Sequence, residues 1–104
     1  MHMIKKLSSM AVDETFGALE YARMAVEKKM DYPDIAETMY RLSGEELSHA
    51  MMLHDLATAH LEKMKKESST DAIAAQILYD FIYEMQIDKT NEAKNYQAMY
   101  KGNM

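Results

Sequence analysis

Apolar residues recur three or four positions apart through most of the chain, which is the spacing of one face of an α-helix. Two short segments interrupt this pattern, MDYPD at residues 30–34 and ESST at residues 67–70. We find no strand pattern and no internal repeat. The pattern therefore predicts an all-α protein with one domain over residues 1–104 and helices at about residues 3–30, 34–66 and 70–100.

Residues that favour helix ends stand at each boundary: Asp31 or Tyr32 before Pro33 at the first break, Ser69 or Thr70 before Asp71 at the second, and Gly102 near the C-terminus. Because the breaks are short, consecutive helices are expected to be antiparallel neighbours.

The second predicted helix carries a stripe of residues spaced alternately four and three apart: Ile35, Met39, Leu42, Glu46, His49, Leu53, Leu56 and His60. Glu46 and His49 stand where the series calls for apolar residues, whereas Glu45 lies off the stripe. A carboxylate and an imidazole in a helical seam are costly unless they are paired or bind a metal. One alternative is a capping box of Ser43 with Glu46, in which Gly44 ends an earlier helix.

Acidic residues also interrupt the apolar faces of the other two helices. In the first helix, Glu14 falls within the expected core face of Ile4, Leu7, Ala11, Ala18, Ala22 and Ala25, while Asp13 points away. The third helix is expected to bury Ala74, Leu78, Phe81, Met85, Tyr96 and Met99, with Asp88 and Glu92 on the same side. Alternatively, these two acids belong to a partly solvated helix end.

In antiparallel helices, residues equally distant from a turn lie at the same level. Glu14 and Asp88 are thereby expected level with His49, and Glu92 level with Glu46. Carboxylates with one imidazole suit iron, manganese or zinc. The sequence thus predicts a metal site of Glu14, Glu46 and His49 with one or both of Asp88 and Glu92.

These features resemble the ferritin-like superfamily, and its rubrerythrin type in particular. The similar stretch is residues 14–55, about 40% of the chain, and contains Tyr21 seven residues after Glu14, the turn KKMDY and the motif EELSHA. The resemblance implies that Glu14, Glu46 and His49 bind a di-iron centre, with Glu46 bridging, although an ungapped register would select Asp13. It also implies ferroxidase or peroxide-reducing activity.

The chain departs from that family in lacking a fourth helix and a second Glu-x-x-His. Two completions are open. Either two chains pair into a four-helix bundle, as in the shortened ferritin-like proteins of encapsulin compartments, or the third helix closes the site with Asp88 and Glu92. A rival interpretation is a non-enzymatic adaptor or assembly module on a ferritin-like scaffold with a lost or reduced metal site.

Composition excludes several kinds of binding partner and metal site. The formal net charge of −5 argues against binding to nucleic acid or to an anionic membrane, and the absence of cysteine excludes disulfides and thiolate metal sites. No apolar run is long enough to span a membrane. We therefore expect a cytoplasmic protein. The missing half of the ligand set predicts a homo-oligomer, a dimer or larger, and the resemblance implies oxygen or peroxide as the small-molecule substrate.

Overall fold

The computed structural model describes residues 2–67 and 70–102, and it consists of three helices. They are α1 (His2–Lys28), α2 (Pro33–Lys66) and α3 (Ala72–Lys101). Each boundary falls within two residues of the prediction, and the described residues contain no strand. The all-α class predicted from the sequence is confirmed.

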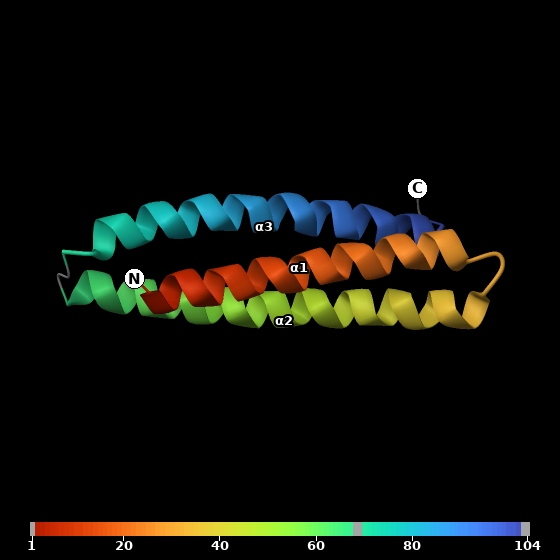
Figure 1. Cartoon of the computed structure of the whole chain (residues 1–104), viewed down its shortest axis with the longest axis horizontal. Coiled ribbons are helices and arrows are strands. Elements are labelled where there is room, and N and C mark those ends of the chain that lie inside the picture. Colours follow the sequence, from red (N-terminus) through yellow and green to blue (C-terminus); the bar gives the residue numbers. More distant parts are fainter. Residues whose placement is uncertain (1, 68–69, 103–104) are drawn as a thin grey trace.

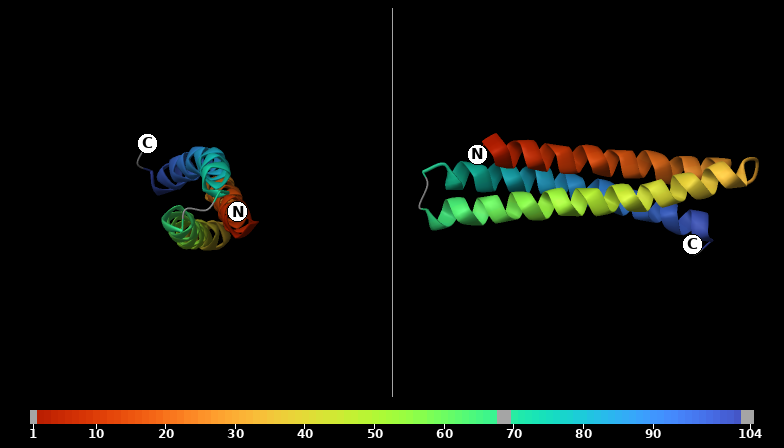
Figure 2. Two further views of the ribbon diagram at one scale, coloured as in Figure 1. Left: turned by 90° about the vertical axis from the view of Figure 1, so that its left-hand side faces the viewer. Right: turned by 90° about the horizontal axis from the view of Figure 1, so that it is seen from below.

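The helices lie side by side in a rod of 56 × 19 × 16 Å (Figures 1 and 2). α1 and α2 run in opposite directions along the long axis, and α3 runs in the same direction as α1 (Figure 1). α1 is the central helix, since α3 packs mainly on α1 and contacts α2 much less. None of the helices in the described residues is long and apolar enough to cross a membrane.

The helix ends follow the local sequence. Pro33 begins α2, and the amide of Ala36 donates a hydrogen bond to the carbonyl oxygen of Tyr32 at 2.9 Å. Asp71 precedes α3, in place of the expected Thr70, while Ser69 lies outside the described residues. Gly102 ends α3 with φ of 80°, a left-handed conformation that glycine adopts readily.

Small side chains line the contacts between the helices. The buried face of α1 contains every residue expected there: Ile4, Leu7, Ala11, Ala18, Ala22 and Ala25. On α2 the buried positions are Ala36, Ser43, Ala50, Ala57 and Leu61. Because most of these side chains are small, the backbones of α1 and α2 can approach closely.

The face predicted to be buried on α2 is wrong in part. His49 and His60 are exposed, and Ile35 and Leu56 keep 41% and 49% of their surface accessible. The row of small residues faces the neighbouring helices, and the stripe of larger side chains is turned toward the edge of the contact with α1. Among the described residues, those that line this edge come from α1 and α2 alone, so the larger side chains are only partly covered.

The prediction for α3 is also wrong in most positions, since Ala74, Phe81, Met85 and Met99 are exposed and only Leu78 and Tyr96 are partly buried. Its buried residues are Ala75, Gln86 and Ala93, whereas Phe81 and Met85 are 65% and 40% exposed. Alanine at two of these three positions lets α3 lie close to α1. The larger apolar side chains of the first half of α3 consequently face outward.

Candidate metal centre

Three side chains that could bind a metal ion converge from two helices. Glu14 comes from α1, and Glu46 and His49 come from successive turns of α2. One ligand atom from each residue lies within 4.8 Å of the other two. The level estimated from the turn, which placed Glu14 beside His49, agrees with this arrangement.

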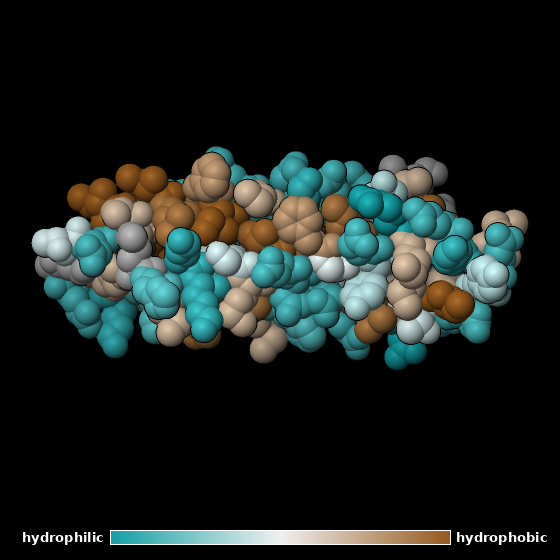
Figure 3. Space-filling model, viewed as in Figure 1, coloured by the Kyte–Doolittle hydropathy of each residue, from teal (hydrophilic) through white to brown (hydrophobic). Residues whose placement is uncertain are grey.

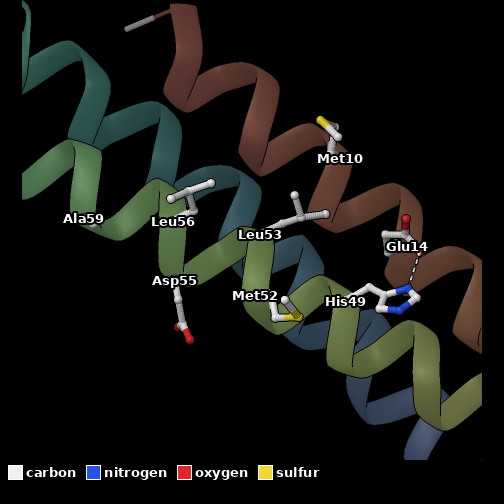
Figure 4. A pocket seen from close by; sticks show the side chains of 8 residues that line it. All are labelled: Met10, Glu14, His49, Met52, Leu53, Asp55, Leu56 and Ala59. Carbon is white, nitrogen blue, oxygen red and sulfur yellow. Dashed lines mark ion pairs between the residues drawn. The ribbon is translucent and has the colours of Figure 1, made fainter.

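The atomic distances are compatible with a single ion. His49 Nδ1 lies 3.6 Å from Glu46 Oε1 and 3.8 Å from Glu14 Oε2, the second pair being marked in Figure 4. Both distances exceed that of a hydrogen bond. Donor atoms that bind one ion at about 2.1 Å are separated by roughly 3.0–3.4 Å, so small side-chain movements would bring these atoms to coordination distance.

The two carboxylates perturb each other. A hydrogen bond with Glu14 is the largest cause that raises the pKa of Glu46, followed by burial and by the negative charge of Glu14. His49 opposes this change. Two carboxylates held this close favour either a shared proton or a bound cation.

The backbone around Glu46 is fixed by small and polar residues. Gly17 of α1 leaves room for the carboxylate, since a Cβ atom there would lie 3.4 Å from Glu46 Oε2. One turn before Glu46, the buried Ser43 hydroxyl donates a hydrogen bond to the carbonyl oxygen of Ala18 at 2.7 Å. The capping-box alternative is therefore wrong, because Ser43 lies inside a continuous helix and its hydroxyl contacts α1.

A shallow apolar groove of about 740 Å³ continues from this cluster along the edge of α1 and α2 (Figure 4). Its lining consists of Met10, Glu14, His49, Met52, Leu53, Asp55, Leu56 and Ala59. The side chain of His49 is 55% exposed at one end of the groove, compared with 34% for Glu14 and 24% for Glu46. The cluster is consequently open on the groove side.

Asp88 and Glu92 lie outside this cluster. Both are exposed on α3, and Lys89 Nζ lies 2.9 Å from Glu92 Oε2 and 3.8 Å from Asp88 Oδ2. The expected repulsion between the two acids is thus relieved by the lysine between them. Asp13, the alternative to Glu14, is exposed and also lies outside the cluster.

Ser43 and Gln97, which fix the turn of α2 before Glu46, were not identified as supporting residues from the sequence. Gln97 of α3 donates a hydrogen bond to Ser43 Oγ at 2.8 Å, so a third helix reaches the turn before Glu46. The signal available for Ser43 was its seven-residue spacing from Ala36 and Ala50. Gln97 carried no comparable signal.

A scan against models of protein families found no match to the chain. Searches of curated proteins and of solved structures found none either.

Proposed function

We propose that the protein binds a transition-metal ion, with iron as the leading candidate, through Glu14, Glu46 and His49. The observation that carries the proposal is the convergence of two carboxylates and one imidazole, from two helices, within 4.8 Å. Manganese and zinc suit the same donors, whereas calcium is disfavoured because it prefers a shell made of oxygen alone.

The charges around Glu46 support a cation. The proximity of Glu14 raises the pKa of Glu46, which means that the ionised pair is unfavourable in the metal-free protein. A divalent ion between the carboxylates would remove this repulsion. It would also satisfy His49 Nδ1, which lies 3.6 Å and 3.8 Å from the two carboxylates and so too far for a hydrogen bond to either.

Three side chains are half of the ligand set of a carboxylate-bridged di-metal site in a helical bundle. The half-exposed His49 and the apolar groove beside it support completion by a second copy of the chain. In such a dimer, the α1 and α2 helices of both copies form a four-helix bundle with six ligands. Completion by α3 is less well supported, since Asp88 and Glu92 pair with Lys89.

Within this site, Glu46 would be the bridging carboxylate, a role supported by its side chain being the least exposed of the three. Glu14 and His49 would bind at either side of it. Bound iron would supply one-electron chemistry with oxygen or peroxide, as in a ferroxidase or a peroxide-reducing protein. Met10 and Leu53 give the groove beside the carboxylates an apolar lining.

The second candidate function is that of a non-enzymatic assembly module. Large exposed apolar side chains on α2 and α3, among them Met52 at 69% and Ile73 at 76%, favour it. Metal content separates the two candidates, because an assembly module does not require a bound ion.

The test measures metal content and molecular mass in solution on the same sample. Protein loaded with Fe(II) without oxygen is expected to hold roughly one to two ions per pair of chains. Glu46→Ala with His49→Ala should hold none, while the exposed controls Glu45→Ala and His60→Ala should bind as the unmodified chain does. Equal metal content in the double variant would overturn the proposal.

Turnover needs its own measurement. Oxidation of Fe(II) by oxygen or peroxide should be faster with the protein than in buffer, and the double variant should return the rate to that of buffer. A site that binds iron without accelerating its oxidation would limit the function to binding.

A further inference from the structure

The first half of α3 carries an apolar ridge that faces outward. Its members are Ala74, Leu78, Phe81 and Met85, flanked by Ile73 and Ile77. Ile73, Ile77 and Phe81 are 76%, 67% and 65% exposed. Figure 3 shows the corresponding brown surface over the beginning of α3. No member of the ridge lines the groove at the candidate metal centre, so this is a separate surface.

The spacing of the ridge is that of a helix-pairing seam. Its four central residues are separated by four, three and four positions, which is the a/d pattern of a coiled coil. Such a seam matches another helix better than an irregular loop or a flat surface. The partner must therefore present a helix with apolar residues at similar intervals.

Charges lie on both sides of this seam. Lys5 of α1 lines a hollow on one side with Ala74, Leu78 and Phe81. Lys65 of α2 lines another hollow with Ile73 and Ile77. Each lysine comes from a different neighbouring helix, so the two lysines flank the beginning of the seam on opposite sides.

An acidic residue follows on the side of Lys65. Glu84 is exposed and stands seven positions after Ile77, so it lies on the same face of α3 as Ile77. This side of the seam therefore has Lys65 at one end, where it also pairs with Glu62 at 3.3 Å, and Glu84 at the other.

We propose that the α3 ridge binds the α3 ridge of a second copy in antiparallel orientation. Pairing Ala74 with Met85 of the partner subunit also pairs Leu78 with Phe81 of the partner subunit, so every layer of the seam is apolar. In an antiparallel pair, the two-fold axis is perpendicular to the helices, so each side of the seam meets the same side of the partner's seam. Lys65, level with Ile73 and Ile77, then faces Glu84 of the partner subunit, and this contact occurs twice.

Parallel pairing fits less well. In a parallel pair, the two-fold axis runs along the helices. Each residue then lies at the same height as its own copy, and one side of the seam meets the opposite side of the partner's seam. Lys5 would then face Lys65 of the partner subunit. Like charges at these positions disfavour the parallel arrangement.

The seam spans about three helical turns, so its interface falls below the size of stable protein complexes. We expect a reversible dimer that forms at roughly micromolar concentration. Because the ridge and the metal-site groove are separate, this dimer does not require metal.

The experiment measures the dimer dissociation constant by sedimentation equilibrium in EDTA, with Glu46→Ala and His49→Ala present so that the metal site cannot contribute. This metal-free background should still dimerise. Phe81→Asp should weaken the dimer by at least about 100-fold. Met51→Asp, at a position of α2 that is 51% exposed, should leave it unchanged. Helix content measured by circular dichroism confirms that each variant is folded.

A charge exchange tests the orientation. Lys65→Glu should weaken the dimer about ten-fold, and the addition of Glu84→Lys should restore it. The adjacent exposed control Lys66→Glu should have little effect. A monomer at about 100 μM in EDTA, or a Phe81→Asp variant that dimerises normally, would overturn the proposal. Failure of the charge exchange alone would overturn the antiparallel arrangement.

Discussion

The hydroxyl of Ser43 on α2 donates a hydrogen bond of 2.7 Å to the carbonyl oxygen of Ala18 on α1. The same hydroxyl accepts a hydrogen bond from Gln97 of α3, so one buried side chain contacts all three helices. Ala18 follows Gly17, and Ser43 precedes Glu46 by one turn. This contact therefore fixes the position of Glu46 relative to α1.

Replacement of Ser43 should destabilise the protein. Ser43→Ala removes a buried hydrogen bond and leaves the Gln97 amide without its acceptor, so the free energy of unfolding should fall by about 1–2 kcal/mol. Urea unfolding measures this value. The exposed Ser48→Ala control should change it by less than about 0.5 kcal/mol. A similar loss in both variants would contradict the role given to Ser43.

Both glycines inside α1 and α2 should tolerate alanine. Gly17→Ala and Gly44→Ala should each raise the free energy of unfolding by up to about 1 kcal/mol, because glycine weakens a helix interior. A Cβ at Gly44 meets nothing within 4 Å, and one at Gly17 is in ordinary contact with Glu46 Oε2 at 3.4 Å.

Leucine at the same two positions tests whether metal binding needs the space beside Gly17. Gly17→Leu is expected to displace Glu46 and lower the metal affinity at least about ten-fold, measured by competition with a chelator. Gly44→Leu should retain the affinity of the unmodified chain. Equal affinities in the two leucine variants would show that Glu46 does not need the space beside Gly17.

Neutralising Glu46 should stabilise the metal-free protein as the pH rises. The folded-state pKa of Glu46 is raised above the reference value of 4.5, so the folded protein retains a proton that the unfolded chain has lost. Stability of the unmodified chain therefore falls as pH rises from about 4.5 through the raised pKa. Glu46→Gln does not lose stability in this way. Its melting temperature should therefore exceed that of the unmodified chain by an amount that grows as the pH rises from about 4.5.

Added metal should make the unmodified chain more stable than Glu46→Gln. Added Fe(II) is expected to raise the melting temperature of the unmodified chain and to have little effect on Glu46→Gln. Glu45→Gln, exposed and one position earlier, serves as the control and should follow the unmodified chain in both experiments. A variant that is less stable than the unmodified chain without metal would contradict this account.

A hydrogen-bonded chain between α2 and α3 assigns the tautomer of His54. Thr58 Oγ1 donates to the His54 carbonyl oxygen at 3.0 Å, so its contact of 2.6 Å with Tyr79 Oη uses the tyrosine proton. Tyr79 Oη can then accept a hydrogen bond from His54 Nε2 at 3.2 Å, so the neutral His54 ring carries its proton on Nε2. The His54 ring also stacks on Tyr83, with ring centroids 3.9 Å apart.

Acid should destabilise the folded protein through His54, because the partly buried ring is costly to protonate. Burial lowers the pKa of His54 below 6.5, although the negative charge of Asp55 opposes the change. As pH falls below about 6.5, the unfolded chain takes up a proton before the folded protein does, and stability decreases. His54→Gln should therefore lose less stability than the unmodified chain between pH 7 and pH 5 in urea unfolding. Parallel losses would show that His54 does not titrate as inferred.

The sequence contained enough information for the helices and for the level of the site. Helical periodicity and short breaks place Glu14 beside His49 with an error of no more than about one helical turn. Periodicity also identified the core face of α1, where the buried residues are apolar except for Ser8 and Thr15.

The exact faces of α2 and α3 were not predictable in this way. A hydropathy pattern selects large apolar side chains, but helices that approach closely bury small ones. Ser43 reads as polar and Ala50 as only weakly apolar, yet both are buried where α2 packs on the bundle. The pattern assigns Phe81 to the core, yet it is exposed, because none of the described residues covers the outer side of α3.

The central place of α1 has a consequence for the order of folding. Contacts between α1 and α2 join segments that are close in the sequence, whereas contacts between α1 and α3 join residues about seventy positions apart, such as Ile4 and Ala75. Local contacts form faster because less loop entropy is lost. We therefore expect α1 and α2 to associate first, during synthesis, with α3 docking later. Glu14, Glu46 and His49 would then meet before α3 has docked.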